Sequence, residues 1–119
     1  MKVLVVEDNP LNMELVTELL NAQGFITDGA MDGEEAIRKA EKDVYNLIVR
    51  DIGLPGIDGV EATKRIRTKS LNKFVPVIAL TAFAMKGDRD RFIKSGFDAY
   101  LSKPINVPEF MKVIGKYKE

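Results

Sequence analysis

The chain has 119 residues, which suits one domain with a substantial buried core. Lysine plus arginine and aspartate plus glutamate number 18 each, so the net charge is zero and no broad basic field favours nucleic acid. Cysteine and histidine are both absent, which excludes disulfides, thiolate or imidazole metal sites, and catalysis by a histidine general base.

No apolar run approaches the roughly 20 residues that a membrane span requires. Met1 and Lys2 lead directly into a strand pattern, which leaves no room for a signal peptide. We therefore expect residues 1–119 to form a single cytoplasmic domain, with no membrane partner and no direct nucleic-acid partner. Its chemistry has to come from carboxylates, hydroxyls, lysines and arginines.

The first part of the chain alternates strand and helix patterns. The apolar run 3–6 predicts a central strand, and Asn9 followed by Pro10 is a strong signal for the start of a helix that ends at Gly24. Segment 25–30 is more polar and predicts an edge strand, after which 32–35 resembles a capping box that opens a second helix. The apolar stripe of the first helix comprises Leu11, Leu15, Val16, Leu19 and Leu20.

The alternation continues to the end of the chain. Three further strands are predicted at 46–51, 75–80 and 99–101, and three further helices at about 58–68, at about 84–95 and from Pro108 onward. Five strands with single-helix crossovers predict a parallel sheet covered on both faces. Because the first, third and fourth runs are the most apolar, the predicted fold is a doubly wound, flavodoxin-like (βα)5 domain with strand order 2-1-3-4-5.

Polar residues stand where four of these strands end. Asp51 closes the most apolar run, and open α/β sheets build their sites at the carboxyl ends of strands. In the predicted strand order, the side chains that meet at this edge are Glu7, Asp8, Asp51, Thr81 and Lys103. Three close carboxylates repel one another, and Mg²⁺, a hard ion that prefers oxygen ligands, relieves that repulsion. With a lysine and a hydroxyl beside it, one accessible carboxylate makes a site that accepts a phosphoryl group.

Four motifs along the chain together resemble the receiver domains of response regulators, of the CheY-like superfamily, over nearly the whole length. They are Val5-Val6-Glu7-Asp8-Asn9, Asp51 with Leu54-Pro55-Gly56-Ile57-Asp58-Gly59, Leu80-Thr81-Ala82, and Ser102-Lys103-Pro104-Ile105. Segment 82–88 further resembles DivK-type stand-alone regulators and the receivers of hybrid histidine kinases.

The resemblance implies a role for each matching position. Asp51 is the implied phosphoacceptor, Asp8 the main Mg²⁺ ligand, Glu7 a ligand mostly through water, and the Gly53 backbone carbonyl the remaining protein ligand, with Mn²⁺ as the alternative ion. Thr81 is implied to hydrogen-bond the phosphoryl group, and Lys103 is implied to pair with that group. Tyr100 is implied to act with Thr81 as the switch, by turning inward. The peptide bond before Pro104 is implied to be cis. Gly53 and Phe83 border the approach of the hydrolytic water and are implied to tune the lifetime of the phosphoryl group.

The implied function is a signalling switch in a two-component phosphorelay, which catalyses only its own phosphorylation and dephosphorylation and is not otherwise an enzyme. A histidine kinase or a histidine phosphotransfer protein is the implied donor. Phosphorylation is expected to change the face built from the fourth predicted helix, strand 99–101 and the last helix, and so the binding of a downstream protein that the sequence does not identify.

Plainer interpretations stay open at this stage. In these interpretations Asp51 only caps the following turn, and Glu7 and Asp8 are an acid pair at a helix N-terminus that the helix dipole stabilises. Thr81 is then an N-cap, Lys103 a solvated turn residue and Tyr100 an ordinary edge-strand tyrosine. A receiver-like interaction module that is never phosphorylated is the alternative function. A haloacid-dehalogenase-like phosphatase also uses a strand-end aspartate, but that family needs a second aspartate where this chain has Gly53.

Arg50 departs from the resemblance, because receivers usually have an apolar or small residue just before the acceptor. Strand alternation directs its side chain away from Asp51, toward the opposite face of the sheet. Two outcomes are open: the stem packs while the head reaches the edge of the sheet and an acidic group there, or the side chain is simply solvated.

Overall fold

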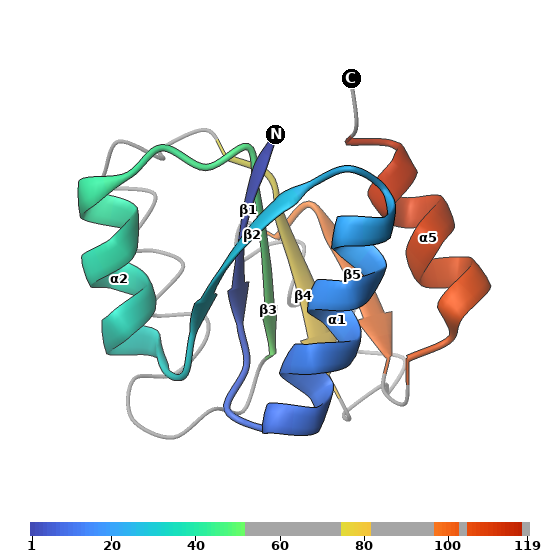
Figure 1. The fold of residues 1–119 in the computed structure, drawn as a ribbon, viewed down its shortest axis with the longest axis horizontal. Coiled ribbons are helices and arrows are strands. Elements are labelled where there is room, and N and C mark those ends of the chain that lie inside the picture. Colours follow the sequence, from blue (N-terminus) through green and yellow to red (C-terminus); the bar gives the residue numbers. More distant parts are fainter. Residues whose placement is uncertain (52–74, 82–96, 103–104, 118–119) are drawn as a thin grey trace.

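The computed structural model describes residues 1–51, 75–81, 97–102 and 105–117. It contains a five-stranded sheet of β1 (Lys2–Val6), β2 (Ile26–Ala30), β3 (Leu47–Asp51), β4 (Val77–Thr81) and β5 (Ala99–Ser102). All neighbouring strands are parallel and their order is β2-β1-β3-β4-β5, so their carboxyl ends share one edge (Figure 1). The predicted strand order is confirmed, and strand bounds differ from prediction by one or two residues.

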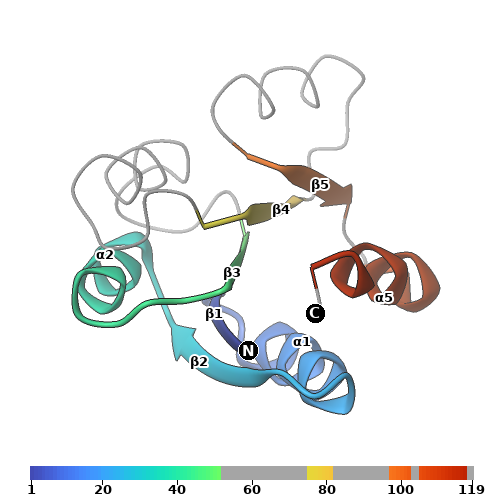
Figure 2. The same cartoon turned by 90° about the horizontal axis from the view of Figure 1, so that it is seen from above.

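Three helices are described, α1 (Pro10–Ala22), α2 (Gly33–Lys42) and α5 (Val107–Gly115). Figure 2 shows α1 and α5 on one face of the sheet and α2 on the other, which is the doubly wound arrangement. The helices predicted at about 58–68 and 84–95 lie outside the described residues. Among the residues described, no helix combines the length and apolar character needed to cross a membrane.

Side-chain caps define where the helices begin. The Asn9 carboxamide oxygen accepts from the backbone N–H groups of Leu11 and Asn12, at 2.9 and 3.1 Å, and the Asp32 carboxylate accepts from the Glu35 N–H at 2.8 Å. These bonds satisfy donors that a helix start leaves without an intrahelical partner. The predicted capping box is modified, because the Glu35 carboxylate accepts from the N–H of Met31. Gly24 has φ 90°, a conformation that favours glycine after a helix end.

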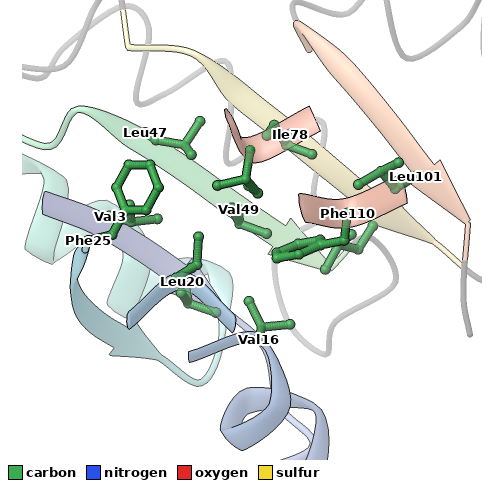
Figure 3. Close-up of a cluster of buried hydrophobic side chains, with 12 residues drawn as sticks. Val3, Val16, Leu20, Phe25, Leu47, Val49, Ile78, Leu101 and Phe110 are labelled. Atoms are coloured by element: carbon green, nitrogen blue, oxygen red, sulfur yellow. The ribbon is translucent and has the colours of Figure 1, made fainter. Parts of the chain in front are cut away.

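The layer between the sheet and helices α1 and α5, called the α1/α5 layer, is built from buried apolar side chains (Figure 3). Phe110 of α5 is 1% exposed and packs in it with residues of β1, β3 and β4. The layer comprises Val3, Val5, Val16, Leu20, Phe25, Leu47, Val49, Ile78, Leu80, Leu101, Phe110 and Ile114. Removal of this much apolar surface from water is the main stabilising contribution that the described part of the fold displays.

The apolar stripe predicted for α1 is partly wrong. Val16 and Leu20 are buried, whereas Leu11 is 76% and Leu15 is 37% exposed. Successive helical residues turn by about 100°, so Leu15 lies about 100° and Leu11 about 140° from Val16 around the helix. Helical spacing placed all five apolar residues in one predicted stripe, but the sheet covers only the side of α1 on which Val16 and Leu20 lie.

The layer beneath α2, called the α2 layer, is also apolar but carries a polar connection at its edge. It comprises Leu4, Val6, Ala30, Ala36, Ala40, Tyr45, Ile48, Val75, Val77, Ala79 and Phe97. The Tyr45 hydroxyl donates to Asp28 of β2 at 2.7 Å, and the Lys39 ammonium of α2 donates to the same carboxylate at 2.9 Å and to the Gly29 carbonyl. Burial alone would raise the pKa of Asp28, but the bonds from Lys39 and Tyr45 and the Lys39 charge hold that pKa below its usual value. Burial and Asp28 raise the pKa of Tyr45.

Candidate functional site

The ends of β1 and β3 bring three carboxylates together. Val6 of β1 is in register with Arg50 of β3, so the next residues, Glu7 and Asp51, lie at the same level of the sheet edge. Each of Glu7, Asp8 and Asp51 offers one oxygen, and these oxygens all lie within 4.8 Å of one another. Two segments more than 40 positions apart in the sequence therefore build one acidic cluster, as predicted.

The three carboxylates differ in exposure and in how they are held. Glu7 is 1% exposed, and its backbone N–H donates to the Ala30 carbonyl at 2.9 Å, which extends the pairing of β1 with β2. Its carboxylate accepts from the Asn9 N–H at 3.1 Å. Asp51 is 9% exposed, whereas Asp8 is open to solvent. Glu7 and Asp51 are thus the buried members of the cluster, and Asp8 is the member open to solvent.

The cluster has the donor set and spacing that suit Mg²⁺. Oxygen ligands at opposite corners of an octahedral Mg²⁺ lie about 4.2 Å apart, twice the usual bond length of about 2.1 Å. Three oxygens within 4.8 Å need little movement to surround one such ion, and less if one of them acts through water. Without a cation the same oxygens repel one another, since two unit charges at 4 Å interact by about 4 kcal/mol at an effective dielectric constant near 20.

Other predicted site residues are placed only in part. Thr81 is the last residue of β4, one position beyond Leu80, which is in register with Asp51. Thr81 is itself in register with Ser102 at the end of β5, so the backbone of all four predicted strand ends reaches one edge. Gly53, Phe83, Lys103 and Pro104 lie outside the described residues, and their roles stay predictions.

Tyr100 lies in β5, half-buried against the α2 layer. Its register partner is Ala79 of β4. This position is compatible both with an ordinary edge-strand tyrosine and with the predicted inward-turning switch.

Arg50 is the residue whose environment sequence analysis missed. Its exposure is 0%, so the interpretation as a solvated side chain is wrong. The guanidinium nitrogens are each shielded from solvent, so the head is buried as well as the stem. Its register partners are Val6 and Ala79, which belong to the α2 layer, so the predicted direction away from Asp51 agrees with the observed register. The uninterrupted apolar run before it was the signal for burial.

Residues 3–115 match the family of response regulator receiver domains. The chain belongs to this family. The resemblance that four short motifs indicated is thereby confirmed over most of the sequence.

Individual relatives agree with this assignment. The polar-differentiation response regulator DivK of Brucella anthropi is 45% identical over 115 residues, which cover 97% of this chain and 94% of that protein. The receiver domain of the sensor histidine kinase PA1611 from Pseudomonas aeruginosa PAO1 was crystallised with a magnesium ion coordinated in its active site cleft. It is 37% identical with a TM-score of 0.87, over 98% of this chain and 95% of that one. The chemotaxis response regulator CheY4 of Vibrio cholerae is 30% identical with a TM-score of 0.90, over 98% of each chain.

Membership makes the chain a phosphoacceptor signalling domain of the two-component type and places it outside the classical enzyme families. Its flavodoxin-like fold is the one that the CheY-like structures share.

Proposed function

We propose that Asp51 accepts a phosphoryl group from a phosphohistidine on a histidine kinase or a histidine phosphotransfer protein, in a step that requires Mg²⁺. The observation that carries this proposal is the acidic cluster at the carboxyl edge of the sheet, where oxygens of Glu7, Asp8 and Asp51 lie within 4.8 Å of one another. Support for the ion comes from the related PA1611 receiver domain, which holds magnesium in its active site cleft.

Asp51 is the nucleophile of the proposed step. One of its carboxylate oxygens attacks phosphorus while the bond from phosphorus to the imidazole nitrogen breaks; the electron pair stays on the imidazole, and an acyl phosphate forms on Asp51. Asp8, Glu7 through water, and the Gly53 carbonyl would hold the Mg²⁺. When bound, this ion neutralises charge on the phosphoryl oxygens. The Thr81 hydroxyl and the Lys103 ammonium hydrogen-bond those oxygens.

The phosphoryl group is proposed to act on partners through Thr81 and Tyr100. Thr81 moves toward the phosphoryl oxygens, and the half-buried Tyr100 turns inward into the space that this movement opens. Both residues belong to the strands at one side of the sheet, β4 and β5. The surface that changes is proposed to include β5 and α5 together with the helix predicted at about 84–95, which lies outside the described residues. A downstream protein binds this surface.

The test uses acetyl phosphate as a small phosphoryl donor and intact mass as the readout. The wild-type chain should gain the mass of one phosphoryl group in Mg²⁺ and none in EDTA, whereas Asp51→Asn should gain none in either. Asp43→Asn, an exposed substitution of the same type, is the matched control and should behave as wild type.

Three results would contradict the proposal. Mass gain by Asp51→Asn equal to that of wild type would place the acceptor elsewhere, and equal gain in EDTA would remove the metal requirement. No gain by the wild-type chain with acetyl phosphate or a phosphorylated histidine kinase would favour an interaction module that is never phosphorylated.

A further inference from the structure

Arg50 and two carboxylates of the site share one small region of the interior. In the part of the chain that the structure describes, the buried polar or charged side chains are Glu7, Arg50 and Asp51. Arg50 directly precedes Asp51 in β3, and its register partner Val6 directly precedes Glu7 in β1. The buried positive charge is therefore attached one residue from Asp51 and one register step, on the neighbouring strand, from Glu7.

The charge on Arg50 is permanent and poorly screened. A guanidinium keeps its proton at every pH at which proteins fold, so burial does not neutralise it as it would a lysine. Its nitrogens are shielded from water, and its partners in register, Val6 and Ala79, are apolar. Dissolved salt screens such a charge much less than it screens a surface charge.

The separation from the acidic cluster is short on the electrostatic scale. Consecutive Cα atoms are about 3.8 Å apart, so even with the Arg50 stem extended to the opposite face, its charge lies on the order of 10 Å from the carboxylates. At that distance one positive charge offsets part of the repulsion among three carboxylates and, equally, repels a divalent cation that they bind.

We propose that Arg50 is the resident counter-cation of the Glu7–Asp8–Asp51 cluster and lowers the affinity of that cluster for Mg²⁺. This inference rests on the Mg²⁺ binding proposed above. Arg50 acts as a positioning residue through the field it exerts on the carboxylates and need not touch the ion. A receiver with a neutral residue before the acceptor has no such charge and should bind Mg²⁺ more tightly at equal ligand geometry.

Arg50→Met tests the proposal, because methionine keeps an unbranched apolar stem and removes the charge. Isothermal titration of Arg50→Met with Mg²⁺ in metal-free buffer should give a dissociation constant about tenfold lower than that of wild type. This change lies between the one calculated with the dielectric constant of water and the one calculated with that of a protein interior. Arg50→Gln also removes the charge but differs from methionine in shape and polarity, and it should tighten binding by a similar factor. Arg38→Met removes one exposed charge from α2 and should change the constant less than twofold.

Several outcomes would overturn the proposal. One is a dissociation constant for Arg50→Met within twofold of wild type. Another is tightening in Arg50→Met with none in Arg50→Gln, which would make side-chain packing and not charge the cause. If Arg50→Met does not fold, Arg50→Gln replaces it. Failure of both neutral variants to fold in saturating Mg²⁺ also contradicts the proposal, because a bound divalent ion should compensate for the missing charge. A wild-type chain that binds no Mg²⁺ contradicts the proposed site itself, whereas equal binding by wild type and Arg50→Met contradicts only the role of Arg50.

Discussion

The two faces of the sheet support different properties of this protein. The α1/α5 layer consists of apolar side chains from six elements and of Phe25, which lies between α1 and β2. The α2 side also holds the buried Arg50 and the bonds among Asp28, Lys39 and Tyr45. The acidic cluster lies at the edge where β1 and β3 end. The free energy of unfolding should therefore be most sensitive to changes in the α1/α5 layer. The proposed binding of Mg²⁺ and phosphorylation should be most sensitive to charge changes at the carboxyl edge of the sheet and on the α2 side.

The largest expected loss of stability comes from Phe110→Ala in the α1/α5 layer. Loss of a fully buried aromatic side chain leaves a cavity and should lower the free energy of unfolding by about 3–5 kcal/mol. Urea denaturation measures it. Leu11→Ala on the exposed side of α1 is the control and should cost less than about 0.5 kcal/mol. Similar losses for both variants would show that the layer does not dominate stability.

Tyr45→Phe on the α2 side should cost less. The change removes the hydroxyl that donates to Asp28 at 2.7 Å, and hydrogen bonds to charged groups contribute about 1.5–3 kcal/mol. Equilibrium unfolding at pH 7 measures the cost.

The cost of Tyr45→Phe should also depend on pH. The pKa of Asp28 is lower in the folded protein than its ordinary value of 3.8. The stabilisation is therefore complete above the unfolded pKa and is lost as pH falls through the folded pKa. The stabilities of wild type and Tyr45→Phe should begin to converge below about pH 4. A difference that stays constant from pH 7 to pH 3 would show that the charge on Asp28 is not involved.

Asp8→Asn should have a smaller effect on stability, and of the opposite sign. In EDTA it removes one of three mutually repelling carboxylates, which should raise the free energy of unfolding by about 1 kcal/mol, the energy of two charges at 4 Å in water. Added Mg²⁺ should stabilise wild type and have little effect on the variant. Unfolding curves with and without Mg²⁺ provide the measurement. A destabilised variant in EDTA would mean that Asp8 has a structural partner that outweighs the repulsion.

The last and smallest expected effect is on the lifetime of the phosphoryl group, at the two positions proposed to border the hydrolytic water. Glycine at 53 and phenylalanine at 83 have no group that orients water, so the phosphoryl group should be lost slowly to moderately fast. Gly53→Asn or Phe83→Glu should shorten its lifetime while phosphorylation still proceeds. The decay of phosphorylated mass after donor removal measures the lifetime. Unchanged decay in both variants would show that water access at these positions does not control it.

Much of the architecture follows from local sequence. Apolar runs ending in polar residues located four of the five strands, and the more polar composition of 25–30 placed β2 at an edge. The caps at Asn9 and Asp32 located the starts of α1 and α2, and Pro108 located the start of α5 to within one residue. The residues at the strand ends also identified Glu7, Asp8 and Asp51 as one cluster, because parallel strands with helical crossovers must align their carboxyl ends. These features follow from the preferences of short segments and from the periodicity of apolar residues, both of which can be recognised in the sequence.

Only the tertiary structure decided which residues of an apolar pattern are buried and how close charged side chains come to one another. Helical spacing includes Leu11 and Leu15, but only the side of α1 facing the sheet is buried. No local rule connects Asp28 with Lys39 and Tyr45, since their contact depends on how α2 packs on the edge strand. Burial of Arg50 likewise depends on the whole fold: it lies in the central strand β3 between Val6 of β1 and Ala79 of β4, although intrinsic preference would place an arginine in water. Local preference acts over a few residues, whereas burial and electrostatics depend on everything that folding brings near.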